Sequence, residues 1–122
     1  MSKNKKLVIA NWKMNPKSLK EAKRLFTDVK KVASKTQKLQ TVICPPSVYI
    51  NELSKMYSGH RIAIGAQDVF WETDGSFTGE VSPSDLKALN CEYVIVGHSE
   101  RRQHMGETND MIHRKVKAVL AA

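Results

Sequence analysis

The stretch YVIVGHSERR, residues 93–102, runs apolar residues into a glycine and then places His98, Ser99, Glu100, Arg101 and Arg102 in succession. Short, continuously apolar runs are typical of strands in parallel sheets that helices cover. In such sheets ligands bind at the carboxyl ends of the strands. A lone histidine at a strand end is more often structural than functional, so its interpretation depends on what the other strands bring to the same edge.

Three similar apolar runs precede this stretch, each followed by a helix signal. Strands are expected near residues 7–10, 40–44, 61–66 and 93–97, with a helix after each. The order βαβαβαβα predicts an α/β fold with parallel strands and right-handed connections over residues 1–122.

Capping residues and helical spacing locate the helices. Ser18 and Glu21 form a capping-box pattern, Ser82 precedes Pro83, and Thr108 is a further cap. Apolar residues at helical spacing predict two buried faces: Leu19, Ala22, Phe26, Val29 and Val32 or Ala33 in the first helix, and Met111, Ile112, Val116, Val119 and Leu120 in the last.

Composition narrows the class of protein. The chain has 122 residues, 41% of them hydrophobic, which suits one core. No apolar stretch approaches the roughly 18 residues of a membrane span, and MSKNKK leads into a strand instead of a signal-peptide core, so we expect a cytoplasmic protein without membrane contact. Cys44 and Cys91 lack a Cys-x-x-Cys spacing and are expected to be buried thiols. His60, His104 and His113 show no metal-ligand spacing, and neither a metal nor a cofactor is expected.

The formal net charge of +8 raises the question of nucleic-acid binding. Many of the lysines lie in residues 17–38, on the faces of the expected helix that its apolar residues leave free. That distribution is typical of a solvated helix surface, so nucleic acid is not expected as a partner.

Polar residues collect where the expected strands end. They are Asn11, Lys13 and Asn15 after the first strand, Gln67 and Asp68 after the third, and His98, Ser99 and Glu100 after the fourth. Convergence of several strand ends favours a functional site over an isolated structural histidine.

Four motifs in register carry a resemblance to a known family. ANWKMN (residues 10–15), GAQDV (65–69), GSFTGEVS (75–82) and YVIVGHSERR resemble those of triosephosphate isomerases in order and spacing. The resemblance runs over the whole chain and implies half of a (β/α)₈ TIM barrel, an N-terminal (βα)₄ unit, because a complete barrel takes about 250 residues.

The resemblance also implies a reaction, the interconversion of dihydroxyacetone phosphate and glyceraldehyde 3-phosphate through an enediolate in glycolysis and gluconeogenesis. It implies catalytic roles for Lys13, His98 and Glu100 and substrate binding by Asn11 and Lys13. His98 is expected to act as a neutral imidazole, because the positive end of a helix disfavours imidazolium. Ser99 and Arg101 are implied as supporting residues, and an inter-subunit loop is implied for Gln67, Phe77, Thr78, Gly79 and Glu80.

One catalytic group has no match. The family's base is a glutamate after the sixth strand, and its phosphate loops follow the seventh and eighth strands; Glu80, Glu92 and Glu107 do not match the motif of the base. We therefore expect the isolated chain to be inactive and its apolar inner face to require a partner. The partner could be a separate C-terminal half of the barrel or a second copy of this chain. The half-barrel length could come from a natural gene split or from a truncation. The alternative function is a non-catalytic, self-associating half-barrel scaffold.

Overall fold

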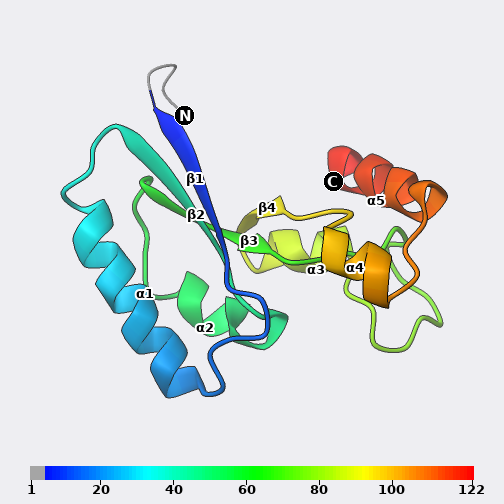
Figure 1. The fold of residues 1–122 in the computed structure, drawn as a ribbon, viewed down its shortest axis with the longest axis horizontal. Helices are drawn as coiled ribbons and strands as arrows, with labels where there is room; N and C mark the ends of the chain where they lie inside the picture. Colours follow the sequence, from blue (N-terminus) through cyan, green and yellow to red (C-terminus); the bar gives the residue numbers. More distant parts are fainter. Residues whose placement is uncertain (1–4) are drawn as a thin grey trace.

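A computed structural model describes residues 5–122; residues 1–4 of the MSKNKK stretch lie outside the described part. Figure 1 shows strands alternating with helices along the chain. The elements are β1 (Lys6–Asn11), α1 (Leu19–Ala33), β2 (Leu39–Cys44), the 3₁₀ helix η1 (Ser47–Tyr49), α2 (Ile50–Ser54), β3 (Ile62–Ala66), α3 (Pro83–Ala88), β4 (Cys91–Val94), α4 (Ser99–His104) and α5 (Asn109–Ala121). The predicted α/β order is confirmed.

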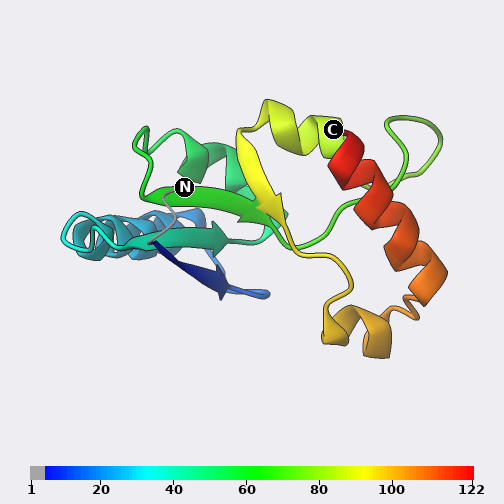
Figure 2. The same cartoon turned by 90° about the horizontal axis from the view of Figure 1, so that it is seen from above.

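The four strands form one parallel sheet in the order β1-β2-β3-β4, with β1 and β4 at its edges (Figure 2). Strand order equals chain order, as in one half of a barrel, because each helix returns the chain to the next strand. The expected fourth strand, 93–97, differs from the observed one, which begins at Cys91 and ends at Val94. A register shift between Ile64 and Gly65 disturbs the ladder with β3, although the amide of Ile95 still donates to the carbonyl of Ala66 at 2.9 Å.

Two apolar clusters cover the two faces of the sheet. The larger cluster packs α1, α2 and α3 against one face, and Phe26, Ile43 and Leu53 are among its fully buried members. The smaller cluster joins Val42, Cys44 and Ala63 on alternate strand positions, with Tyr93 and Ile95 against them. Because successive side chains of a strand point to opposite faces, the second cluster lies on the face that no helix of this group covers.

The helix caps follow the sequence signals, except that the complete capping box is at Ser82 and not at Ser18, where it was expected. Ser18 accepts from the Glu21 amide and Thr108 from the Met111 amide. The complete reciprocal capping box is at Ser82, whose side chain accepts from the Asp85 amide while its own amide donates to the Asp85 carboxylate.

The predicted apolar face of the last helix is only partly buried. Val116 is 40% exposed and Leu120 is 79% exposed, whereas the one buried residue of α5 is Lys115. In α1, Ala33 is buried but Val32 is 66% exposed. The alternative of Val32 or Ala33 is thus decided in favour of Ala33. The expectations were wrong for Val116 and Leu120 in α5 and for Leu19 in α1, which is 37% exposed, because no described element packs over those parts of the two helices.

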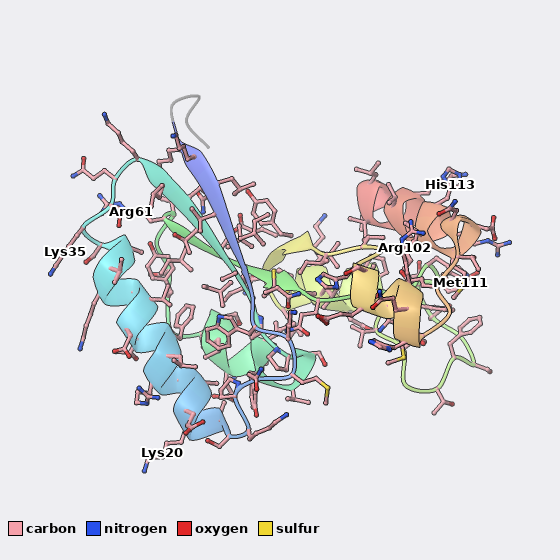
Figure 3. All side chains as sticks on the ribbon, in the orientation of Figure 1. Lys20, Lys35, Arg61, Arg102, Met111 and His113 are labelled. Carbon is pink, nitrogen blue, oxygen red and sulfur yellow. The ribbon has the colours of Figure 1, made fainter. Side chains whose placement is uncertain are left out.

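The basic residues of α1 are mostly on its solvent side. Lys20 points away from the sheet, as does Lys35 just beyond the helix (Figure 3). Lys23 and Arg24 contact Glu52 and Asp28 as exposed ion pairs. Within residues 5–122, no helix combines the length and the apolar character that crossing a bilayer would require.

Candidate active site

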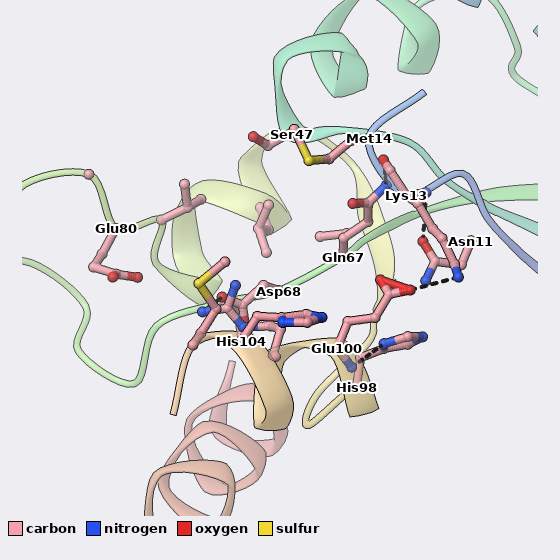
Figure 4. A pocket seen from close by; sticks show the side chains of 17 residues that line it. Asn11, Lys13, Met14, Ser47, Gln67, Asp68, Glu80, His98, Glu100 and His104 are labelled. Carbon is pink, nitrogen blue, oxygen red and sulfur yellow. Dashed lines mark hydrogen bonds and ion pairs between the residues drawn. The ribbon is translucent and has the colours of Figure 1, made fainter. Parts of the chain in front are cut away.

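A pocket of about 400 Å³ opens where the carboxyl ends of the strands meet (Figure 4). Asn11 and Lys13 reach it from the end of β1, Gln67 from the end of β3, and His98 and Glu100 from the segment after β4. The structure therefore brings together polar residues that lie far apart in the sequence.

The backbone of Lys13 adopts an unusual conformation. Its φ is +58°, in the left-handed region that non-glycine residues seldom occupy. The Lys13 amide donates to Oδ1 of Asn11 at 2.9 Å, and Nε2 of Gln67 donates to the Lys13 carbonyl at 2.8 Å. Strained conformations of this kind persist only when surrounding contacts fix them, and they concentrate at functional sites.

The side chain of Lys13 is paired with Glu100. Its Nζ lies 2.6 Å from Oε1 of Glu100. The hydrogen bond from Lys13 lowers the pKa of Glu100 below its ordinary value of 4.5. Both side chains remain about half exposed, so the pair faces solvent at the mouth of the pocket and stays accessible to an anionic ligand.

His98 is the N-cap of α4 and lines the pocket. Its Nδ1 accepts from the amide of Glu100 at 3.1 Å. Because Nδ1 accepts in this bond, Nε2 is the ring nitrogen left to donate to a ligand. Gly97, with φ +71°, turns the chain immediately before His98, and a Cβ there would lie 2.9 Å from Ile112 of α5.

The remaining expected site residues are distributed around the pocket. Ser99 is exposed at the first position of α4, and Arg101 lines the pocket together with Gly79 and Glu80. Thr78 is exposed, away from the pocket lining.

The loop between Phe70 and Val81, which carries Thr78, Gly79 and Glu80, is held at its base. Phe70 stacks on Trp71 with ring centroids 4.3 Å apart and lies 4.8 Å from Phe77. The Phe70 amide donates to the Val81 carbonyl at 2.8 Å, which closes the loop. The guanidinium of Arg114 on α5 lies 5.8 Å from the Trp71 ring.

An ion cluster that begins at the wall of the pocket was missed by the sequence analysis. Nζ of Lys115 lies 2.8 Å from Oδ1 of Asp68 and 3.0 Å from Oε2 of Glu107, and Arg101 contacts both acids. The Lys115 and Glu107 side chains are almost fully buried. A sequence signal existed: Lys115 stands four residues after Met111 and four before Val119, on the apolar stripe of α5.

The ion cluster lowers the pKa of Glu107. Burial raises the pKa of Glu107, but the hydrogen bonds from Arg101 and Lys115 outweigh it, so the pKa lies below 4.5. Oε1 of Glu107 has no hydrogen-bond partner among the described residues. The cluster ties α4 and α5 to the end of β3 at the cost of desolvating four charges.

The two thiols are free, and burial raises the pKa of both Cys44 and Cys91 to about 11. Residues 5–122 contain no group of three or more His, Cys, Asp or Glu side chains placed to hold a metal ion. Because the pKa of Cys44 and of Cys91 lies well above 7, both thiols are protonated and poorly nucleophilic at neutral pH.

Comparison with known proteins identifies one family. The family model described as triosephosphate isomerase matches residues 6–122. The chain is 45% identical over 114 residues to the triosephosphate isomerase of Dictyoglomus turgidum and 41% identical over 116 residues to that of Aquifex aeolicus. These alignments cover 93% and 95% of this chain but 45% and 47% of the relatives. The chain thus spans about half the length of the curated relatives it matches.

Proposed function

The chain belongs to the triosephosphate isomerase family, and we propose that it is the N-terminal half of an enzyme that interconverts dihydroxyacetone phosphate and glyceraldehyde 3-phosphate in glycolysis and gluconeogenesis. The observation that carries this proposal is the convergence of Lys13, His98 and Glu100 on one pocket at the strand ends (Figure 4). A cation beside a neutral imidazole suits a reaction in which negative charge develops on a substrate oxygen.

The proposed chemistry follows from the donors in the pocket. The reaction removes a proton from one substrate carbon and returns one to its neighbour, and the enediolate between them carries its charge on oxygen. Nε2–H of His98 donates to that oxygen, and the ammonium of Lys13 attracts both the oxygen and the substrate phosphate. The Asn11 side chain accepts from the Lys13 amide through Oδ1, which leaves its NH₂ group to donate to the substrate.

Glu100 holds the ammonium of Lys13 before substrate arrives. Because the pair is half exposed, an incoming phosphate can replace the carboxylate as the partner of Lys13 without breaking a buried contact. We therefore give Glu100 the role of presenting Lys13 to the ligand. The base that abstracts the carbon-bound proton comes from the complementary half.

The proposal includes a partner that closes the barrel. β1 and β4 are edge strands, and Leu7, Val8 and Ile9 of β1 are 43–51% exposed. Exposed apolar edges of this kind favour pairing with further strands. A C-terminal half meets this need and supplies the base and phosphate loops. The loop around Thr78 is proposed to reach a neighbouring subunit, in keeping with its exposure.

A cytoplasmic location belongs to the same proposal. It is supported by the two free thiols, because a reducing compartment keeps cysteines in this form.

The rival function is a self-associating scaffold without catalysis. The exposed apolar residues on β1 and α5 favour it, since a second copy also could cover them. A second copy would supply neither the base nor the phosphate loops, so catalysis separates the two functions.

Complementation tests the proposal. The chain is mixed with the C-terminal half of the Dictyoglomus turgidum relative, and triose-phosphate interconversion is measured beside a matched mixture that contains Lys13→Ala. We expect activity only with the unaltered chain. A folded mixed assembly with no more activity than the Lys13→Ala mixture would refute the isomerase proposal and leave the scaffold.

A further inference from the structure

We propose that Gln67 and Asp68, adjacent residues at the end of β3, are positioning residues that together set the separation of Lys13 and His98. They extend in opposite directions: Gln67 holds the backbone of Lys13, and Asp68 holds the helix that follows His98. The catalytic meaning of this arrangement rests on the function proposed above, whereas the contacts themselves do not.

Gln67 restrains the strained lysine. Its Nε2 donates to the Lys13 carbonyl at 2.8 Å and to the Cys44 carbonyl at 2.9 Å, so one side-chain amide joins the ends of β1 and β2 to the end of β3. The Cys44 carbonyl also accepts from the Trp12 amide at 3.0 Å. Both N–H groups of the amide have carbonyl partners, and no other residue type of this size offers two such donors without a charge.

Asp68 restrains the histidine through α4. Its Oδ2 lies 3.2 Å from Nη2 of Arg101, and its Oδ1 lies 2.8 Å from Nζ of Lys115 on α5. Arg101 follows His98 by three residues, and its amide donates to the His98 carbonyl at 2.9 Å. A shift of α4 away from β3 would therefore move the His98 ring away from the pocket.

The end of β3 is itself buried and hydrogen-bonded, which suits it to serve as the common anchor. Ala66 is buried, and its carbonyl accepts from Ile95 at 2.9 Å, which fixes the segment after β4 to β3. The direct Lys13–Glu100 pair cannot take this role, because an exposed ion pair between two flexible side chains contributes little. The separation of lysine and histidine is thus set by the contacts that Gln67 and Asp68 make in the wall of the pocket.

Amide hydrogen exchange on the chain itself tests the restraint of Lys13 by Gln67 and the restraint of α4 by Asp68 separately. Gln67→Leu removes both donors, and we expect exchange at the Lys13 amide to rise by about tenfold or more. The amides of Arg101 in α4 and of Met105, directly after α4, should keep their rates. Asp68→Ala should accelerate the α4 amides and leave Lys13 unchanged. Gln37→Leu, which alters an exposed glutamine in the connection between α1 and β2, is the matched control and should change neither set. Unchanged exchange at Lys13 in Gln67→Leu, or equal acceleration of both sets by either variant, would overturn the proposal.

Kinetics of the completed assembly give a second readout. Each variant is expected to lower kcat by about tenfold or more with a smaller change in KM, because misplaced groups lose transition-state contacts first. The double variant should lose less than the product of the single losses, since both changes act on one separation. Losses that multiply fully, or that fall on KM alone, would count against the proposal. If the unaltered assembly is inactive the isomerase proposal fails, and the exchange pattern still decides whether Gln67 and Asp68 hold these segments.

Discussion

Nζ of Lys13 lies 2.6 Å from Oε1 of Glu100, so the end of β1 and the first turn of α4 meet across the mouth of the pocket. The contact joins two of the motifs that carry the family resemblance, ANWKMN with its lysine and YVIVGHSERR with its histidine and glutamate. It also links the charge of the lysine to the titration of the glutamate.

The first prediction concerns that titration. The Lys13 hydrogen bond lowers the pKa of Glu100 below 4.5, so Lys13→Ala should raise the pKa toward its ordinary value. Carboxyl-carbon NMR across an acid titration measures it. Lys20→Ala, on the exposed side of α1, is the control and should leave Glu100 unchanged. An identical Glu100 titration in Lys13→Ala would show that the ion pair does not form in solution.

The second prediction concerns catalysis in the completed assembly. Lys13→Ala should weaken both substrate affinity and turnover, because its charge meets the substrate and the enediolate, whereas His98→Ala should fall mainly on kcat. Each loss should be about a hundredfold or more, by analogy with deleted oxyanion donors. Steady-state kinetics provide the measurement. A kcat within about twofold of the parent in His98→Ala would make the histidine structural, since general acid–base groups contribute far more.

The third prediction concerns the buried ion cluster. Glu107→Gln leaves the nearly buried Lys115 with Asp68 as its only acid partner and should lower the free energy of unfolding by about 3 kcal/mol, as expected when a buried pair is broken. Asp110→Asn breaks the exposed pair with Arg114 on the same helix and should cost less than about 1 kcal/mol. Urea unfolding measures the loss of unfolding free energy in each of the two variants. Equal costs would indicate that the cluster is solvated.

The fourth prediction follows from the lowered pKa of Glu107. A carboxyl whose folded pKa lies below its unfolded value stabilises the fold fully above the unfolded value, and that stabilisation is lost as pH falls through the folded one. We therefore expect the unfolding free energy to fall below about pH 4.5. Glu107→Gln should flatten this fall in urea titrations at graded pH. A fall of the same steepness in Glu107→Gln would assign the acid sensitivity to other carboxyls.

The fifth prediction concerns assembly. Leu120 is 79% exposed on α5 beside Val116, and β1 presents further apolar side chains, so the isolated chain should associate at tens of micromolar, roughly the range in which such surfaces aggregate. Leu120→Glu should reduce association in sedimentation velocity. Gln103→Glu makes the same charge change on the exposed surface of α4 and should not. A compact, folded monomer of the unaltered chain at these concentrations would contradict the prediction.

Much of the fold was accessible from the sequence because its signals are local. Ser18, Ser82 and Thr108 each cap a helix through an amide three residues away, so the relevant partners lie within one turn. Short apolar runs located the strands, but the extent of β4 was not predicted. Its ladder depends on the register shift beside Gly65, which is a property of the neighbouring strand.

The candidate site likewise divides into residues that local sequence signals place and contacts that form only in the folded chain. The sequence by itself determined the order of the strands and helices and the residues at each strand end, because backbone propensity, capping and apolar period act over a few neighbouring residues. Only the tertiary structure decided that Gln67 holds the Lys13 carbonyl, that Lys115 is buried between two acids, and that Leu120 is exposed. Those outcomes depend on how parallel strands align their carboxyl ends and on which surfaces find a partner, and such contacts join residues far apart in the chain.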